Sequence, residues 1–277
     1  MKVTLAIPNY NGLENLKILL PRIAKEGFDE IIVIDDKSTD ESISFLKSIS
    51  DIYVIQGDKN IGPAGNRNRV LGKATGDLVV FLDADMELIT KDVVQKLNEL
   101  FSDSSKALVG GLILTLKNEP MWWNYGYELN PVRDAKAAVA HELAFKFWEN
   151  SEVMEYIKNT YKEITRNFEI TFEKPAEMEV DWVSEANLCI RRKVFEEVGG
   201  FDNKMRYHAD QDLCKRVRDR GYKVYFSSLI TTKHMEIDTF GTNRTKFYLE
   251  SLYYYYKKHW GMSKRIFDKL YFSPKQE

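Results

Sequence analysis

The chain has 277 residues, 44% of them hydrophobic and 30% charged, and its formal net charge is −2. This composition is typical of a folded globular domain, and the near-neutral charge argues against a protein whose whole surface binds nucleic acid. At this length one large core can form, alone or together with an insertion.

Neither a membrane-spanning segment nor a secretory leader is expected. No apolar run approaches the about 20 residues that span a bilayer, and Pro8 follows too few apolar residues for a secretory signal. Cys189 and Cys214 lack the paired spacing of a zinc site or of a disulfide framework. We therefore expect a cytoplasmic protein.

Strands alternate with helices in the first third of the chain. The expected strands are Val3 to Ile7, Ile31 to Ile34, Ile52 to Ile55 and Leu78 to Leu82. The expected helices are Gly12 to Lys25, a segment that carries Ile43, Leu46 and Ile49, and Asn66 to Lys73 after a loop from Gly57 to Gly65. This alternation predicts an α/β fold with a parallel sheet, which binds ligands at the carboxyl ends of its strands.

The pattern changes in the middle of the chain and then returns. An aromatic stretch after Lys117 precedes an expected long helix from Ala135 to Arg166, and we interpret residues 117–179 as an insertion. The α/β pattern returns at Val180 to Ile190, with a helix from Asp210 to Arg220 and a strand from Tyr222 to Ser227. We therefore expect a main domain over residues 1–241 and a helical tail over residues 242–277.

Two acidic clusters follow expected strands. Asp36 comes directly after the second strand, where a carboxylate can accept hydrogen bonds from a nucleobase imide or a ribose hydroxyl. The alternative is that Asp36 and Asp40 only turn the chain and cap a helix, and we interpret Asp40 as such a cap. Asp83 and Asp85 follow the fourth strand, and carboxylates there can hold Mg²⁺ together with phosphate oxygens.

A glycine-bearing loop and a histidine add to these clusters. In Asn60 to Arg69 the glycines allow close backbone approach, and backbone N–H groups with Arg67 or Arg69 can hold a phosphate; an ordinary turn before a helix explains the glycines equally well. His234 follows the last expected strand, and its imidazole would suit Mn²⁺, although a lone histidine is usually structural.

A further carboxylate pair opens the late helix. Asp210 and Asp212 lie in the stretch Tyr207 to Cys214. A carboxylate close to a metal-bound donor can take a proton from an attacking hydroxyl, and Asp210 is the candidate because Asp212 already belongs to the helical pattern. The alternative is that Asp210 only caps the helix.

Together these motifs resemble the family 2 glycosyltransferases of the A-type fold, from Val3 to about Gly261. The resemblance implies a Rossmann-like nucleotide-diphospho-sugar transferase fold, with a mostly parallel central sheet and helices on both faces. The segment from Val180 to Tyr225 is most similar to the rhamnosyltransferase branch.

The resemblance also implies roles for individual residues. Asp36 would read the nucleotide base, Asp85 would be the direct ligand of a Mn²⁺ or Mg²⁺ ion, and Asp210 would be the catalytic base. The residues expected at the nucleotide-sugar donor are Pro8, Tyr10, Asp36, Gly62, Arg67, Asp83, Ala84 and Asp85. Those expected at the metal are Asp85, Asp83 and His234. Ala209 departs from the glutamate that the family usually has there, which puts a secondary acceptor contact in doubt.

The implied reaction is transfer of a sugar, with inversion, from a nucleotide-diphosphate sugar to a hydroxyl of a saccharide or lipid-linked saccharide, in polysaccharide or glycoconjugate synthesis. One alternative is a non-catalytic nucleotide-sugar-binding protein, for which Ala209 is the local hint. Another is a sugar-phosphate nucleotidyltransferase, but the turn Pro8 to Gly12 lacks the basic residue which that class would need. No nucleic-acid partner is expected.

The tail combines aromatic and basic residues. A run of tyrosines and Trp260 stand among lysines and Arg265. Such a segment suits a membrane interface at the inner face of the membrane, close to a lipid-linked acceptor. The alternative is that the tyrosines pack against the main domain.

Overall fold

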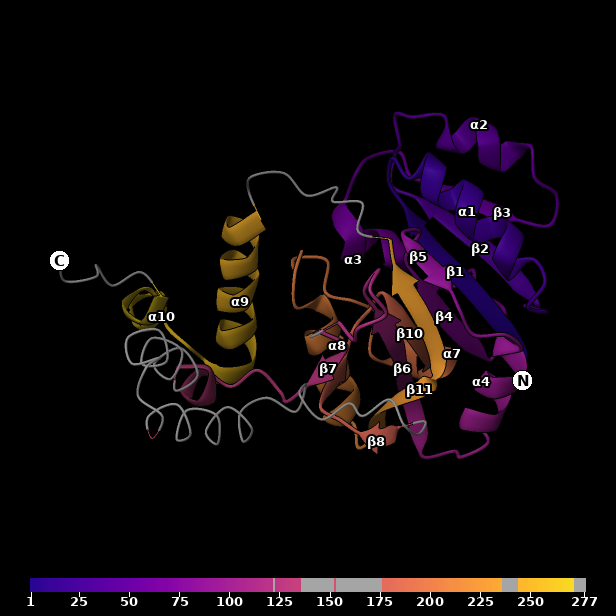
Figure 1. Ribbon diagram of the computed structural model, residues 1–277. Coiled ribbons are helices and arrows are strands. Elements are labelled where there is room, and N and C mark those ends of the chain that lie inside the picture. Colours follow the sequence, from indigo (N-terminus) through magenta and orange to yellow (C-terminus); the bar gives the residue numbers. More distant parts are fainter. Residues whose placement is uncertain (122, 136–151, 153–175, 236–243, 272–277) are drawn as a thin grey trace.

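The computed structural model describes residues 1–121, 123–135, 152, 176–235 and 244–271. Figure 1 shows a central sheet flanked by helices, with helices α9 (Arg244–Trp260) and α10 (Lys264–Tyr271) at the far side of helix α8 (Ala209–Arg218).

Nine strands of the described residues form one sheet. They are β1 (Val3–Asn9), β2 (Glu30–Asp35), β3 (Tyr53–Gln56), β4 (Leu78–Leu82), β5 (Met86–Leu88), β6 (Lys106–Leu114), β8 (Glu177–Glu179), β10 (Asn187–Arg191) and β11 (Lys223–His234). Their order is β3-β2-β1-β4-β10-β6-β11-β5, with β8 also on β11. β1 to β4 are parallel neighbours, as are β6 and β11, whereas β10 runs antiparallel between β4 and β6.

Helices cover both faces of this sheet. One face carries α1 (Leu13–Ile23), α2 (Ser42–Lys47) and α4 (Val93–Leu100), and the other carries α3 (Gly62–Arg67), α7 (Arg192–Glu197) and α8. Strand β1 shows why: Leu5 and Ile7 join the core of the first face and Ala6 joins that of the second, because side chains alternate along a strand. The expected mostly parallel sheet between two helical layers is therefore confirmed.

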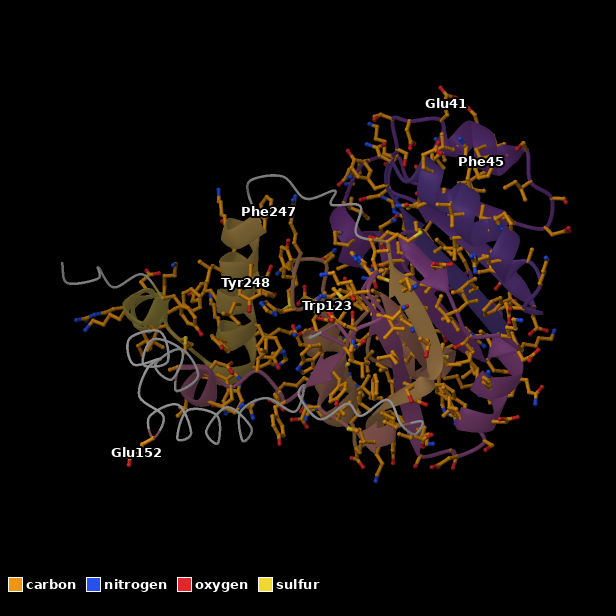
Figure 2. All side chains as sticks on the ribbon, in the orientation of Figure 1. Glu41, Phe45, Trp123, Glu152, Phe247 and Tyr248 are labelled. Atoms are coloured by element: carbon orange, nitrogen blue, oxygen red, sulfur yellow. The ribbon has the colours of Figure 1, made fainter. Side chains whose placement is uncertain are left out.

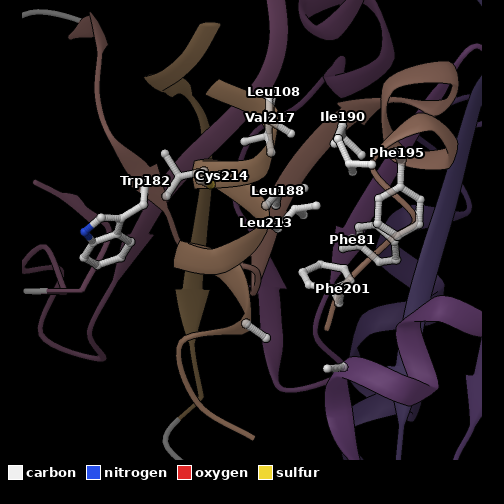
Figure 3. Packing of buried hydrophobic residues seen from close by; sticks show 14 of the residues in the cluster. Phe81, Leu108, Trp182, Leu188, Ile190, Phe195, Phe201, Leu213, Cys214 and Val217 are labelled. Atoms are coloured by element: carbon white, nitrogen blue, oxygen red, sulfur yellow. The ribbon is translucent and has the colours of Figure 1, made fainter. Parts of the chain in front are cut away.

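The core of the second face positions α8. Phe81 of β4 contacts Phe195 and Phe201 edge to face, at ring-centroid distances of 5.2 and 5.4 Å. Leu213 and Cys214 of α8 point into the same cluster (Figure 3). Burial of such side chains stabilises by roughly 1.5–3 kcal/mol each. The start of α8 is therefore set by packing.

Several boundaries differ from those expected. The helix expected near Asn66 begins at Gly62, because the proline that follows is well suited to a first helical turn. The last strand does not end at Ser227 but continues after a register shift to His234. Strand β6 and helix α4 were not expected. The helix expected from Ala135 to Arg166 lies almost entirely outside the described residues, and so does the domain boundary at 241.

The tyrosine run of the tail packs against the main domain. Tyr255 and Tyr256 of α9 are completely buried in the core of the second face. The carboxylate of Asp212, itself fully buried, binds Lys258 and His259 of α9 and Arg216 of its own helix, each at 2.7 Å. No helix among the described residues is long and apolar enough to cross a membrane.

We predict that Asp212→Asn lowers the free energy of unfolding by about 3–5 kcal/mol, because Arg216 and His259 lose the charged partner that the fully buried Asp212 provides, whereas Lys258 keeps Asp202. Burial opposes the charged carboxylate, but the bonds from His259, Arg216 and Lys258 outweigh it and lower the pKa of Asp212 to about 2. This stabilisation is complete above the ordinary pKa of 3.8 and is lost as the pH falls toward 2.

Urea denaturation of both proteins measures the effect. Asp219→Asn is the matched control, since Asp219 pairs with Lys215 on the exposed face of α8 and should cost at most about 1 kcal/mol. Equal losses in the two variants would contradict the anchoring role of Asp212.

Candidate active site

Three neighbouring strands end at the edge where the expected donor residues gather. Pro8 lies in β1 opposite Ile34 of β2, and β4 lies on the other side of β1. Tyr10 follows β1 and is half exposed, and Asp36 follows β2. The two carboxylates of the Asp-x-Asp loop, with the buried Ala84 between them, follow β4.

Two antiparallel pairings hold the Asp-x-Asp loop. Strand β10 pairs with β4, and the amide of Asp83 donates to the carbonyl of Ala186 at 3.1 Å. Strand β11 pairs with β5, and the amide of Met235 donates to the carbonyl of Asp85 at 2.9 Å. These registers bring Glu185 beside Asp83 and His234 beside Asp85.

A buried arginine joins the first of these pairs. The guanidinium of Arg67, whose side chain is 3% exposed, contacts Asp83 at 2.5 Å and Glu185 at 2.8 Å. Asp210 is a further negative neighbour of this cation. The terminal nitrogens expected at a phosphate are thus engaged by carboxylates, so the expected donor contact of Arg67 stays a prediction.

Burial and mutual repulsion raise the pKa values of these carboxyl groups. Burial raises the pKa of Glu185 to about 8, with Asp210 and Asp83 adding to the shift against the attraction of Arg67. Burial raises the pKa of Asp210 to about 6, opposed by the amide of Gln211 and by Arg67. The pKa of Asp83 is also raised by burial. One arginine therefore does not neutralise the cluster.

The second pair fits a divalent cation. The buried Oδ1 atom of Asp85 has no hydrogen-bond partner among the described residues, and its Oδ2 lies 3.4 Å from Nε2 of His234. No group of three or more His, Cys, Asp or Glu side chains in the described part of the chain is placed to hold a metal by itself. Mg²⁺ typically takes one or two carboxylates and completes its shell with water and substrate phosphates, which this arrangement permits.

The expected base-reading residue has structural partners. The carboxylate of Asp36, almost fully buried, accepts hydrogen bonds from the amides of Ile61 and Gly62 at 2.9–3.1 Å, and Arg69 lies 3.4 Å away. Asp36 thus holds the start of α3. A carboxylate has about four acceptor positions, so Asp36 could accept a hydrogen bond from a nucleotide in addition to those from Ile61 and Gly62.

Asp210 lies within the first turn of α8. The helix begins at Ala209, and the residue in the capping position is His208, with a left-handed φ of 62°. Asp210 is therefore not the cap that the alternative interpretation requires. Its Oδ1 accepts the amide hydrogen of Gln211 at 2.8 Å, and the positive end of the helix favours its ionised form.

Other residues near these motifs have structural roles. Trp182 is buried and donates its indole N–H to the carbonyl of Tyr127, so it belongs to the core. Asp40 accepts the amide hydrogens of Ser42 and Leu13 and thereby joins the starts of α2 and α1. The sequence marks Glu185, together with Trp182, only as a candidate for an acceptor wall. In the structure Glu185 pairs with Arg67 and lies near Asp83 and Asp210.

Known proteins share this sequence pattern over most of the chain. The family model of glycosyl transferase family 2 matches residues 4–182. Two similar proteins are the O-antigen chain rhamnosyltransferases RfbN of Salmonella typhimurium, 27% identical over 238 residues, and WbaN of Salmonella anatum, 24% identical over 235 residues. The matches cover 84% and 83% of this chain but 66% and 65% of those proteins, so the chain spans about two thirds of their length.

The fold also has a solved counterpart. The mannosyltransferase PcManGT from Pyrobaculum calidifontis, in complex with GDP-Man and Mn²⁺, matches with a TM-score of 0.59 and 16% identity, over 95% of this chain and 65% of that one. This likeness confirms the A-type glycosyltransferase fold, and the rhamnosyltransferase relatives confirm the resemblance of branch. Since the family match covers more than half of the chain, the protein belongs to glycosyl transferase family 2.

Proposed function

We propose that this chain transfers a sugar, with inversion, from a nucleotide-diphosphate sugar to a hydroxyl of a saccharide or lipid-linked saccharide acceptor. The observation that carries the proposal is that a metal-competent Asp-x-Asp loop and a separate carboxylate of raised pKa, Asp210, meet around one buried arginine. A single displacement requires the leaving group of the donor and the base on opposite sides of the reacting carbon. A donor at the strand ends and a base at the start of α8 fit this requirement.

The reaction divides between the two groups of residues. Asp85, with Asp83 and His234, would hold a divalent cation, which when bound supplies positive charge to the departing diphosphate. Asp210 accepts the proton of the acceptor hydroxyl as the oxygen bonds to the anomeric carbon and the bond from that carbon to the diphosphate oxygen breaks. Attack from the face opposite the leaving group inverts the anomeric configuration.

The donor pocket is proposed at the strand ends. Pro8, Tyr10 and Ala84 line the carboxyl ends of β1 and β4, while Asp36 and Gly62 lie at the end of β2 and the start of α3. The names of the relatives support synthesis of a bacterial polysaccharide as the setting.

The turn after β1 does not favour a nucleotidyltransferase. That class would use a basic residue there, but Asn9 and Asn11 bond to Asp35, Ser38 and Thr39 instead.

Contact with a membrane surface remains our proposal for α10 alone. Its exposed Ile266 and Leu270 stand beside Lys264, Arg265 and Lys269.

We predict that Asp85→Asn weakens metal-dependent binding of a nucleotide sugar at least about tenfold, or about 1.4 kcal/mol, because a hard anionic ligand is lost. Calorimetry with Mn²⁺ and with EDTA measures it. Asp268→Asn, which changes an exposed carboxylate of α10, is the control and should bind as the wild type does. Donor affinity that is insensitive to both EDTA and Asp85→Asn would refute the metal assignment.

We predict that Asp210→Asn lowers transfer at least about 10²-fold while donor affinity stays within a few-fold of wild type, since the amide cannot take a proton. In the wild type, kcat/KM should fall as the pH drops below about 6, because the raised pKa leaves Asp210 protonated there. Initial rates over a pH series, with Asp219→Asn as a control on the same helix, test both. Near-normal transfer by Asp210→Asn would exclude Asp210 as the base.

A further inference from the structure

A cavity with no carboxylate-cluster residue in its lining lies between the loop before α8 and the exposed face of α9. Lys204 and Arg206 line it from the loop, and Phe247, Tyr253 and Tyr254 line it from α9. Its volume of about 310 Å³ lies at the lower end of the roughly 300–1,000 Å³ of ligand sites. It therefore suits one small ligand unit.

The cations of this groove lie against aromatic rings. The guanidinium carbon of Arg206 is 4.3 Å from the ring centroid of Phe247, and the Nζ atom of Lys204 is 5.8 Å from that of Tyr254. Within the described residues neither Lys204 nor Arg206 forms an ion pair. A guanidinium stacked by its face keeps its edge N–H donors, which match a carboxylate or phosphate. The groove thus offers fixed positive charge beside apolar surface.

Hydrogen bonds and a ring contact connect the groove to the segment that precedes the proposed base, Asp210. The hydroxyl of Ser251, in the groove wall, accepts the amide hydrogens of Arg206 and Tyr207 at 3.2 Å. The ring of His208, the next residue, contacts that of Tyr248 at 4.6 Å, and Asp210 follows two positions later. Figure 2 shows Phe247 and Tyr248 on α9, away from the strands that carry the donor residues. The groove therefore shares the segment that leads into Asp210, and none of its lining residues is an expected donor residue.

We propose that this groove binds a saccharide unit of the acceptor that carries an anionic group, a carboxylate or a phosphate. The aromatic rings pack against the apolar face of the sugar ring, and Arg206 and Lys204 bind the anion. Glu250, also in the groove wall, accepts hydrogen bonds from sugar hydroxyls, which distinguishes the site from one for a bare anion. This inference rests on the proposed transferase function and deepens it.

Ligand-detected NMR titrations test the proposal with four probes: glucuronic acid, glucose 6-phosphate, glucose and inorganic phosphate. We expect both anionic sugars to bind with Kd values of roughly millimolar order, and glucose and phosphate at least about fivefold more weakly. Rising salt should weaken the anionic sugars and leave glucose unchanged. If only one of the two anionic sugars binds in this way, the result shows whether the groove prefers a carboxylate or a phosphate.

Variants then locate the binding. Arg206→Ala and Phe247→Ala should each weaken the anionic sugars at least about fivefold, and Arg206→Lys should restore part of the loss, because lysine keeps the charge but not the fork. Lys246→Ala is the matched control, since it removes an exposed cation of α9 next to the groove. Melting temperatures check that each variant is folded. The salt series uses the wild-type protein alone, so it tests the proposal even if a variant fails to fold.

Equal binding of glucose and the anionic sugars, equal binding of inorganic phosphate, or equal losses in Arg206→Ala and Lys246→Ala would overturn the proposal. Titration of the same proteins with nucleotide sugars and Mn²⁺ separates the two hypotheses. If no nucleotide sugar binds the wild type, the proposed transferase function fails; if the donor binds and the anionic sugars do not, only the groove assignment fails.

Discussion

The buried guanidinium of Arg67 is the interaction on which the site depends. The carboxyl groups of Asp83, Glu185 and Asp210 surround this cation, with Asp85 beside Asp83, and the cation offsets only part of their repulsion. A divalent cation can compensate the remaining negative charge. Arg67 also closes helix α3, whose first amides are held by Asp36, so this short helix connects the proposed nucleotide end of the site to its chemical end.

The reversal of β10 explains how distant parts of the sequence form one site. Had the sheet been entirely parallel, the residue before β10 would have lain at the opposite edge. Because β10 runs antiparallel beside β4, the start of β10 pairs with the end of β4, so Glu185, two residues before β10, lies near Asp83, which follows β4. The same holds for His234 at the end of β11, which meets the start of β5. The residues of the site thus lie next to the ends of some strands and the starts of others.

Local patterns could predict only part of this. Apolar runs identified β1 to β4. The expected bounds of β4, Leu78–Leu82, are correct at both ends, because every side chain of this strand is buried and the whole strand is therefore apolar in sequence. The Asp-x-Asp loop was predicted from its place after such a strand, and Asp210 from its place before the helical pattern that includes Asp212. The contact of Arg67 with Glu185 joins residues 118 positions apart, and only the sheet order reveals it. The sequence left two interpretations of the tyrosine run, a membrane surface or packing against the main domain, and the burial of Tyr255 decides for packing.

The two faces of α9 are subject to different constraints. Its inward side carries Tyr255, Tyr256 and the partners of Asp212, where a substitution would disturb the core. Its outward side carries Phe247 and Tyr254, whose replacement would change the groove without opening the interior. Substitutions on the outward side of α9 can therefore change which ligand the groove prefers while the buried side still holds the helix in place. Related enzymes could thus differ in acceptor through a few surface substitutions and keep the same catalytic framework.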